Sequence, residues 1–256
     1  MPMVIRQVEV KNEVGSTTMR EEIKGRRWER LVDRFSEHPD KSPVTRFGNN
    51  YPAIEELGRR LLEFRGRGER IIINEIGVGM GEVGSPLFSR KNVSYEPFEI
   101  LNQVRRAGVK PGEFTLYVMD IRKDVLLAVK TTKVLRVHNL YLEGKWEYFR
   151  GFFPELHELM EEGLIPVGIP EEYRKRIICP KPLDIEKQPA PVKAHITFSF
   201  IPSNSLGQSY FENLVESTKE GGYVLCLRGF DESALARLNV EKIEERGYYG
   251  PVYRVK

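Results

Sequence analysis

Residues 70–82 read Arg70-Ile-Ile-Ile-Asn-Glu-Ile-Gly-Val-Gly-Met-Gly-Glu82, a branched apolar run that ends in three alternating glycines. A short run of such residues cut off by glycine is typical of a strand buried on both faces inside a parallel sheet. Glycines form a turn without side chains, so that backbone N–H groups can approach a bound cofactor. Glu75, near the end of this strand, only accepts hydrogen bonds. It suits a ligand with an ammonium group or hydroxyls better than a pyrophosphate.

Strand and helix patterns alternate along the rest of the chain. Such alternation predicts a mainly parallel sheet with right-handed connections. Two further strand-like segments, 240–245 and 251–255, flank Gly247-Tyr-Tyr-Gly250 and predict an antiparallel hairpin at the end of the sheet. The predicted helices are 19–37, 52–64, 96–107, 124–134, 208–218 and 233–238, and the other predicted strands are 114–119, 177–178, 195–201 and 222–228.

Three parts are expected along the chain. Residues 1–66 are predicted to be an N-terminal arm with a small helical part, and residues 67–256 the α/β domain. Residues 141–175 are rich in aromatic and acidic residues and read as a helical insertion within that domain. The insertion either forms a lid over the site or packs on the core as a helix pair.

Composition excludes several classes of protein. The 256 residues are 40% apolar and 30% charged, as in soluble globular proteins. No apolar run approaches the ~18 residues needed to cross a bilayer, and the first residues lack a secretory signal. We therefore expect a cytoplasmic protein with no membrane partner. The net charge of +3 is too small to predict nucleic-acid binding, although it does not exclude it.

The cysteines and histidines predict neither a disulfide framework nor a metal site. Cys179 and Cys226 are far apart in apolar, strand-like contexts. The four histidines and two cysteines show no metal-ligand spacing.

Three features resemble the class I S-adenosylmethionine-dependent methyltransferases. They are Asn74-Glu-Ile-Gly-Val-Gly-Met-Gly81, which is similar to the first motif of that family, the turn Lys219-Glu-Gly-Gly-Tyr223, and the closing hairpin. The resemblance covers about residues 44–256. It implies a Rossmann-like α/β fold with a mainly parallel seven-stranded sheet, helices on both faces, and S-adenosylmethionine as the cofactor.

Within that class the order of four short segments most resembles the chemotaxis-receptor (CheR-type) methyltransferases. The substrate-side Arg and Tyr of those enzymes have no counterpart here. Asn49 or its neighbour Gly48 stands in place of the Arg, and Pro202-Ser-Asn-Ser-Leu-Gly-Gln208 replaces the segment that carries the Tyr. The resemblance therefore does not imply receptor glutamate as the substrate. The four segments are Val44-Thr-Arg-Phe-Gly-Asn49, Ser94-Tyr-Glu-Pro-Phe-Glu99, Val118-Met-Asp-Ile121 and Leu183-Asp-Ile185.

The resemblance also implies roles for residues around the cofactor. Glu96 would contact its polar end and Asp120 the ribose hydroxyls. In an alternative register Glu96 ends the second strand as the ribose-binding acid and Asp120 closes the third. Without a ligand, Glu96 would simply favour a helix first turn, and Asp120 would cap a helix. The remaining cofactor-binding candidates are Gly77, Gly79 and Gly81 for the methionine part, Asp184 for the adenine amino group, and Phe200 and Ile201 as a wall.

The acceptor side is less specific. Tyr95, Ser203, Asn204 and Ser205 lie on predicted loops at the carboxyl ends of strands, where ligands bind in this architecture. No catalytic residue is identified. We expect methyl transfer to an unidentified protein side chain or small molecule.

Two other functions stay open. The first is a catalytically inactive methyltransferase-like domain that acts as a binding or scaffold protein, because fold does not fix function. The second is an NAD-dependent oxidoreductase, because Gly79-Met-Gly-Glu-Val-Gly84 matches GxGxxG. A long helix to hold a pyrophosphate does not follow that motif directly.

Overall fold

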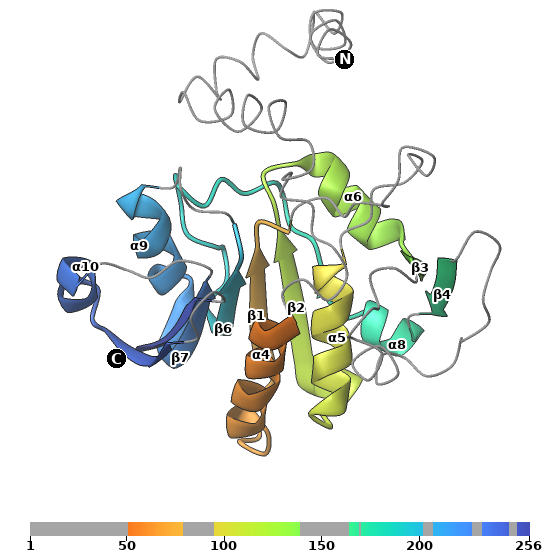
Figure 1. The fold of residues 1–256 in the computed structure, drawn as a ribbon, viewed down its shortest axis with the longest axis horizontal. Coiled ribbons are helices and arrows are strands. Elements are labelled where there is room, and N and C mark those ends of the chain that lie inside the picture. Colours follow the sequence, from red (N-terminus) through yellow and green to blue (C-terminus); the bar gives the residue numbers. More distant parts are fainter. Residues whose placement is uncertain are drawn as a thin grey trace, which may run out of the picture. The chain divides into compact units, whose positions relative to one another are not determined.

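A computed structural model describes residues 51–78, 95–138, 164–168, 170–201, 207–226, 232–245 and 250–256, all within the compact unit Thr45–Lys256. Most of its strands belong to one seven-stranded sheet (Figure 1). Across this sheet, the strands are β5 (Ile177–Ile178), β2 (Phe114–Met119), β1 (Ile71–Ile76), β6 (Ala194–Ser199), β7 (Thr218–Cys226), β9 (Pro251–Val255) and β8 (Val240–Glu245).

The strand directions confirm the predicted fold class. Strands β5, β2, β1, β6 and β7 are parallel, whereas β9 runs antiparallel to both of its neighbours. From β1 the chain builds outward through β2 and β5, and then returns to the other side of β1 for β6 and β7. The strand order therefore reverses between β1 and β6. The result is a Rossmann-like, mainly parallel sheet that ends in an antiparallel hairpin.

Helices cover both faces of the sheet. Helices α4 (Tyr51–Phe64) and α5 (Glu96–Arg106) lie side by side against one face, together with the apolar side of α6 (Lys123–Thr131) (Figure 1). Helix α9 (Gln208–Glu216) packs against the other face. The short helices are α8 (Glu171–Arg174), α10 (Glu232–Arg237) and the 3₁₀ turn η3 (Pro111–Glu113). Within the described part of the chain, no helix has the length and apolar character that a membrane span requires.

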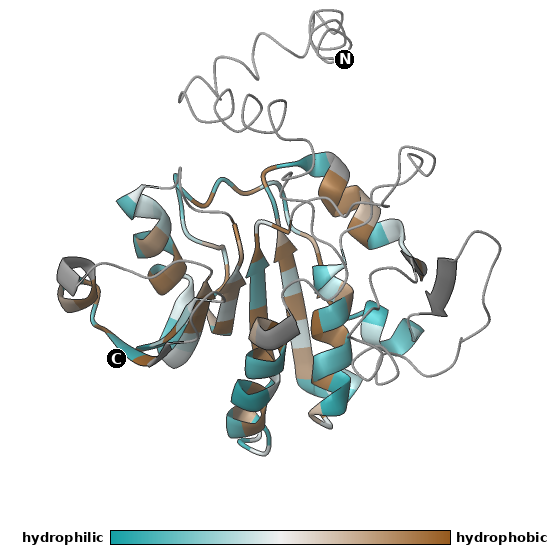
Figure 2. Cartoon of the chain, in the orientation of Figure 1, coloured by the Kyte–Doolittle hydropathy of each residue, from teal (hydrophilic) through white to brown (hydrophobic). Residues whose placement is uncertain are grey.

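The apolar runs of the strands follow from burial on both faces. In β7, Leu225 belongs to the core under α4 and α5, whereas Val224 and Cys226 belong to the core under α9. Successive side chains of a strand point to opposite faces, so a strand covered on both sides needs apolar residues at every position. Figure 2 shows hydrophobic colouring along much of β2, a hydrophilic end on β1, and helices α4 and α5 with mixed colouring.

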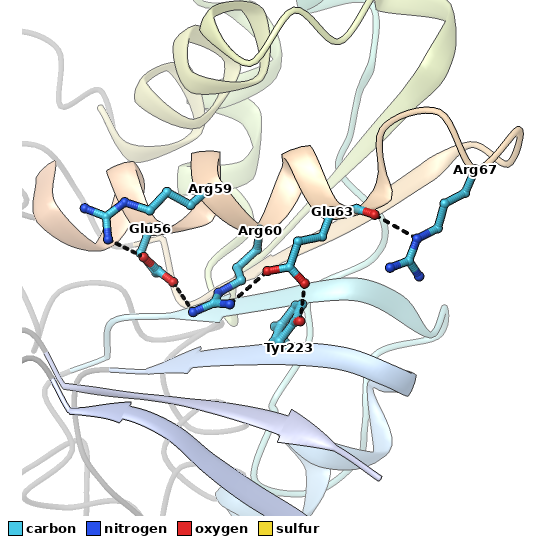
Figure 3. A network of polar contacts seen from close by, with 6 residues as sticks. All are labelled: Glu56, Arg59, Arg60, Glu63, Arg67 and Tyr223. Atoms are coloured by element: carbon cyan, nitrogen blue, oxygen red, sulfur yellow. Dashed lines mark hydrogen bonds and ion pairs between the residues drawn. The ribbon is translucent and has the colours of Figure 1, made fainter.

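A polar network joins α4 to the sheet (Figure 3). Arg60 binds the buried Glu56 at 2.6 Å and Glu63 at 2.8 Å. The hydroxyl of Tyr223 in β7 donates a hydrogen bond to Glu63, and the Arg60 guanidinium lies 4.9 Å from the centre of the Tyr223 ring. Sequence reasoning assigned this helix to a separate part, 1–66, whereas the structure packs it on the same sheet as the rest.

The sequence did not predict a second, two-stranded sheet. Strand β3 (Val134–His138) pairs antiparallel with β4 (Leu164–Gly168). The helix predicted over 124–134 therefore ends at Thr131, and residues 164–168 of the predicted helical insertion 141–175 form a strand instead. The predicted helix 19–37 and residues 141–163 of the insertion lie outside the described residues.

Candidate functional site

Two neighbouring strand ends bring predicted site residues together. Strands β1 and β2 are parallel and in register, with Glu75 opposite Val118 and Ile76 opposite Met119. The N–H of Gly77 then donates to the Met119 carbonyl at 2.8 Å. Gly77 and Asp120 therefore leave the sheet side by side. They lie next to the point where the strand order reverses, which is where ligands bind in open α/β sheets.

Gly77 must be glycine for two reasons. Its φ is +77°, a left-handed conformation that side chains disfavour. A β-carbon built on Gly77 would also lie only 2.1 Å from Cγ1 of Ile201, which follows β6. The space above this glycine is thus filled by the protein's own side chain. Gly79 and Gly81, the other two glycines of the predicted turn, lie outside the described residues.

Glu75 is buried at the end of β1 without a hydrogen-bond partner. Glu75 is only 1% exposed. Neither of its carboxyl oxygens is hydrogen bonded within the described part of the structure. Burial raises the pKa of Glu75 well above its ordinary value, and the nearby carboxyl groups of Glu96, Glu99 and Asp120 raise it further. Burial and the neighbouring acids thus favour the neutral form of Glu75, whereas a nearby cation would favour its ionised form.

The positions of Glu96 and Asp120 decide between the two registers left open by the sequence. Glu96 is the first residue of α5, and Asp120 follows β2, which is the second strand among the described residues. The register that placed Glu96 at a strand end and Asp120 after a third strand is therefore wrong. Both residues are buried, and both face Glu75.

Glu99 also belongs to this cluster of acidic residues, and sequence reasoning missed it. It lies one turn after Glu96 on α5 and is completely buried. A glutamate inside a helix normally indicates a solvated face, which is why it was overlooked. The available signal was its spacing, because residues three apart lie on the same side of a helix and Glu96 was already expected to face the site.

The carboxylates of Asp120 and Asp184 both take part in local turns. Asp120 Oδ1 accepts a hydrogen bond from the Arg122 N–H at 2.8 Å, ahead of α6. The Asp120 carbonyl accepts one from the Leu183 N–H at 2.9 Å, which brings Asp184 to the same strand end. Asp184 Oδ1 accepts from the Glu186 N–H at 3.1 Å, and Oδ2 lies 3.3 Å from Lys187 Nζ. Both carboxylates therefore stabilise local turns at this strand end.

The other predicted residues occupy different environments. Phe200 is buried and its ring lies 4.5 Å from that of Phe198, whereas Ile201 covers Gly77. Tyr95, expected on the acceptor side, is only 2% exposed and belongs to the apolar core. Ser203, Asn204 and Ser205 lie outside the described residues.

A buried hydroxyl chain supports the end of β1 from the opposite helix layer. The Tyr210 hydroxyl, on α9, donates to Ser199 Oγ at 2.8 Å, and Ser199 Oγ donates to the Ile76 carbonyl at 2.8 Å. Burial raises the pKa of Tyr210 far above its ordinary value, so its hydroxyl stays a donor. These hydrogen bonds could not be predicted from sequence patterns, because their partners are 123 and 11 residues apart.

Several other features show no sign of a second reactive centre. Among the described residues, no group of three or more His, Cys, Asp or Glu side chains has an arrangement that could hold a metal ion. Cys179 and Cys226 are both free and buried, and burial raises the pKa of Cys179 to about 11. An open groove of about 300 Å³ lies between α4 and α5, lined by residues such as Arg59, Leu62 and Arg106, away from the strand ends.

Comparisons with known proteins find likeness in structure only. No protein-family model matches the chain, and no curated protein matches it in sequence. A SAM-dependent methyltransferase from Geobacter sulfurreducens, solved with S-adenosyl-L-homocysteine, is 12% identical, with 75% of this chain and 65% of that chain covered and a TM-score of 0.38. The CMeT domain of the citrinin polyketide synthase is 13% identical, with 78% and 50% covered and a TM-score of 0.44.

A SAM-dependent O-methyltransferase from Thermotoga maritima is 12% identical, with 78% of this chain and 65% of that chain covered and a TM-score of 0.37. The chain thus spans between half and two thirds of the length of these three proteins. At such identities and TM-scores the fold assignment rests on the strand order described above. None of the three is named as a chemotaxis-receptor enzyme, so the finer resemblance to that subfamily gains no support from them.

Proposed function

We propose that the chain is an S-adenosylmethionine-dependent methyltransferase that binds its cofactor at the carboxyl ends of β1 and β2. The observation that carries this proposal is the meeting of Glu75, Gly77 and Asp120 beside the reversal of strand order. A cofactor that presents an ammonium group and ribose hydroxyls fits acceptor groups placed in this way.

The position of each candidate site residue indicates its role in this proposal. Asp120, at the tip of β2, accepts hydrogen bonds from the ribose hydroxyls. Glu96 and Glu75 attract the ammonium end, and Asp184, held beside Asp120 through Leu183, is placed for the adenine amino group. The backbone at Gly77 turns away from the sheet without a side chain, and Ile201 packs over it as one wall. By the resemblance, Gly79, Gly81 and Phe200 complete the pocket.

The chemistry asks mainly for position. When bound, S-adenosylmethionine supplies a methyl group on a positively charged sulfur. The protein has to align an incoming nucleophile with the bond that breaks and keep water away, and a nucleophile that is already basic needs little further help. Ser203, Asn204 and Ser205 follow Ile201 in the chain and stay our acceptor-side candidates, with a protein side chain or a small molecule as the acceptor.

The acids at the site disfavour a dinucleotide. Helix α5 begins with Glu96 rather than with the glycines, and both Glu96 and Glu99 lie in its first turns. A pyrophosphate needs a helix N-terminus free of negative charge, whereas these carboxyl groups would repel it. The antiparallel hairpin β8 and β9 also differs from the fully parallel sheet of dinucleotide-binding domains.

Ligand binding by calorimetry tests the proposal. S-adenosylhomocysteine is expected to bind and to raise the midpoint of thermal unfolding, while NAD does neither. The variant Asp120→Asn should weaken binding about tenfold, because a charged acceptor for the ribose hydroxyls becomes a neutral one. The exposed Glu172→Gln on α8 serves as the matched control and should bind as the wild type does. Binding of NAD, or no binding of S-adenosylhomocysteine at millimolar concentration, would refute the proposal.

Transfer of a labelled methyl group distinguishes an enzyme from a binding protein. The purified protein is incubated with methyl-labelled S-adenosylmethionine and fractions of a cell lysate, and the label is followed in protein and small-molecule fractions. The proposal expects label in at least one fraction, and about tenfold less label with Asp120→Asn at a cofactor concentration below the dissociation constant of the wild type. Cofactor binding without any transfer would instead favour the scaffold alternative.

A further inference from the structure

The carboxyl group of Glu75 has no hydrogen-bond partner for either of its buried oxygens within the described part of the structure, and one oxygen of the nearby Glu99 also lacks a partner there. Glu75 is 1% exposed. Buried polar groups in folded proteins are almost always paired, so an exception calls for an explanation. A buried carboxyl group without such partners is either neutral or binds a group that comes from outside the chain.

All the charged groups that act on Glu75 within the described part of the structure are acidic. Glu96 and Glu99 face it from α5 and Asp120 from the end of β2, and they are 4%, 0% and 6% exposed. The thiol of Cys179, at the end of β5, is near enough for Glu75 to affect its ionisation. Asp120 accepts a hydrogen bond from the Arg122 N–H, whereas neither oxygen of Glu75 accepts one from any described residue.

Four carboxyl groups at short range in a buried site do not all ionise. Each added negative charge disfavours the next, and burial adds to the cost. The proton is best retained by a carboxyl group whose ionised form has no hydrogen-bond donor beside either oxygen, and among the described residues Glu75 is in that position. The pKa of Glu75, raised by burial and by the three neighbouring acids, agrees with this assignment. The free protein therefore carries a neutral Glu75 among negatively charged neighbours.

A ligand cation placed beside this group changes the balance. One positive charge at about 6 Å, at the effective dielectric constant that suits protein sites, shifts the ionisation equilibrium of a carboxyl group by about a hundredfold. Direct contact with Glu75 is not required, because Glu96 and Glu99 already act on Glu75 electrostatically and a cation bound to either of them acts on it as well.

We infer that Glu75 and Glu99 form a proton-exchange site for the ammonium group of the cofactor, in which the entry of the cation releases the carboxyl proton of Glu75 to water. The inference rests on the proposed function and adds Glu99 as a binding residue. The charges balance, since one positive charge enters as the ammonium and one leaves as the proton. No covalent bond to the ligand forms or breaks. Cofactor affinity then rises with pH, by up to tenfold per pH unit while Glu75 is protonated in the free protein.

Calorimetry in paired buffers measures the released proton directly. Binding of S-adenosylhomocysteine is recorded at pH 6.5 in phosphate and in imidazole, whose heats of ionisation differ strongly. The difference in apparent binding enthalpy gives the number of protons released, which we expect to be close to one. Methylthioadenosine, which lacks the ammonium group, is expected to bind without proton release.

Variants assign the effect to residues. Glu75→Gln should abolish proton release and make affinity independent of pH between 6 and 8. Glu99→Gln should release clearly less than one proton at pH 6.5 and bind about tenfold more weakly. Glu171→Gln, an exposed residue on α8, is the matched control and should release the wild-type number. If a variant fails to fold, the number of protons that the wild type releases still tests the inference.

The outcomes separate this inference from the proposed function. S-adenosylhomocysteine that binds without proton release, with the same affinity at pH 6 and pH 8, would overturn the inference and leave the methyltransferase standing. Equal proton release from wild type and Glu99→Gln would remove Glu99 from the site. An absence of binding at any pH would overturn both proposals together.

Discussion

The side chain of Ile201 lies directly against the α-carbon of Gly77, in the position that a β-carbon of residue 77 would occupy. The contact joins the ends of β1 and β6, on the two sides of the reversal in strand order. It makes the glycine a packing requirement as well as a conformational one, and the two requirements can be separated by mutation.

Gly77→Ala is expected to destabilise the fold by about 2–4 kcal/mol, because it combines a left-handed backbone with overpacking against Ile201. Gly66→Ala is the control, since Gly66 has φ +85° but nothing within 4 Å of the added carbon. It should cost only about 1 kcal/mol. Urea denaturation measures both. The double variant Gly77→Ala with Ile201→Ala should be more stable than the sum of the single effects predicts, and strict additivity would contradict the proposed clash.

Ser199→Ala should cost more stability than Tyr210→Phe. Removing the Tyr210 hydroxyl takes away one donor, and Ser199 can still donate to Ile76, so a loss of about 1 kcal/mol is expected. Removing the Ser199 hydroxyl leaves the buried Tyr210 hydroxyl without its acceptor, for which about 1–3 kcal/mol is expected. Tyr173→Phe, which deletes a long 3.4 Å bond to the Val109 carbonyl, is the control with a smaller effect. A larger loss of stability for Tyr210→Phe than for Ser199→Ala would contradict this chain of hydrogen bonds.

Stability is expected to fall as the pH drops below about 6.5 because of His195. Its Nδ1 accepts the Ile72 N–H at 2.9 Å, and burial lowers its pKa from the ordinary value of 6.5 although Glu69 partly offsets this. The unfolded chain then binds more protons than the folded one below pH 6.5. This contribution is therefore complete above that pH and is lost as the pH falls toward the folded-state pKa.

The variant His195→Asn tests this origin, because the Asn side-chain oxygen can still accept the Ile72 N–H but does not titrate. Its free energy of unfolding, measured in urea from pH 5 to pH 8, should vary less with pH than that of the wild type. Parallel pH profiles for the two proteins would rule out His195 as the source.

Two charged residues on α4 should differ strongly when they are replaced. Glu56→Ala removes a buried partner of Arg60. We expect the free energy of unfolding to fall by about 2 kcal/mol, because the Arg60 guanidinium loses the carboxylate that offsets its burial. Arg59→Ala removes only an exposed partner of Glu56, with its side chain 62% exposed, and should change stability by less than about 0.5 kcal/mol. Chemical denaturation of both variants measures the two losses of stability. Similar losses would mean that the buried Arg60–Glu56 pair drawn in Figure 3 contributes no more than the exposed one.

Local patterns predicted the elements whose causes are local. The run before Gly77 and the residues 114–119 read as strands because they are rich in branched and aromatic apolar residues, and the hairpin at 240–255 was readable from its turn. The helix from Glu96 was readable from the spacing of Phe98, Leu101 and Val104, all of which are fully buried.

The features that the sequence did not reveal depend on distant partners. Strand β3 is five residues long and pairs with a segment about 30 residues later, so no short turn announces it. Leu62 fits the apolar spacing of α4 and yet is 54% exposed. The burial of Glu99 depends on what packs around α5, and the contact between Ile201 and Gly77 on the pairing of β6 with β1. The resemblance supplied the residue types of the candidate site, while the choice between two registers needed the structure.

The placement of β1 has a consequence during translation. Its neighbour β2 is made soon after it, but its other neighbour, β6, comes much later, since Ile72 and its partner His195 are 123 residues apart. A growing chain on the ribosome therefore carries a central apolar strand with one open edge until residue 199 has been added. Such an edge is a template for pairing with other chains, so a nascent chain stalled before β6 is the form of this protein that most needs a chaperone.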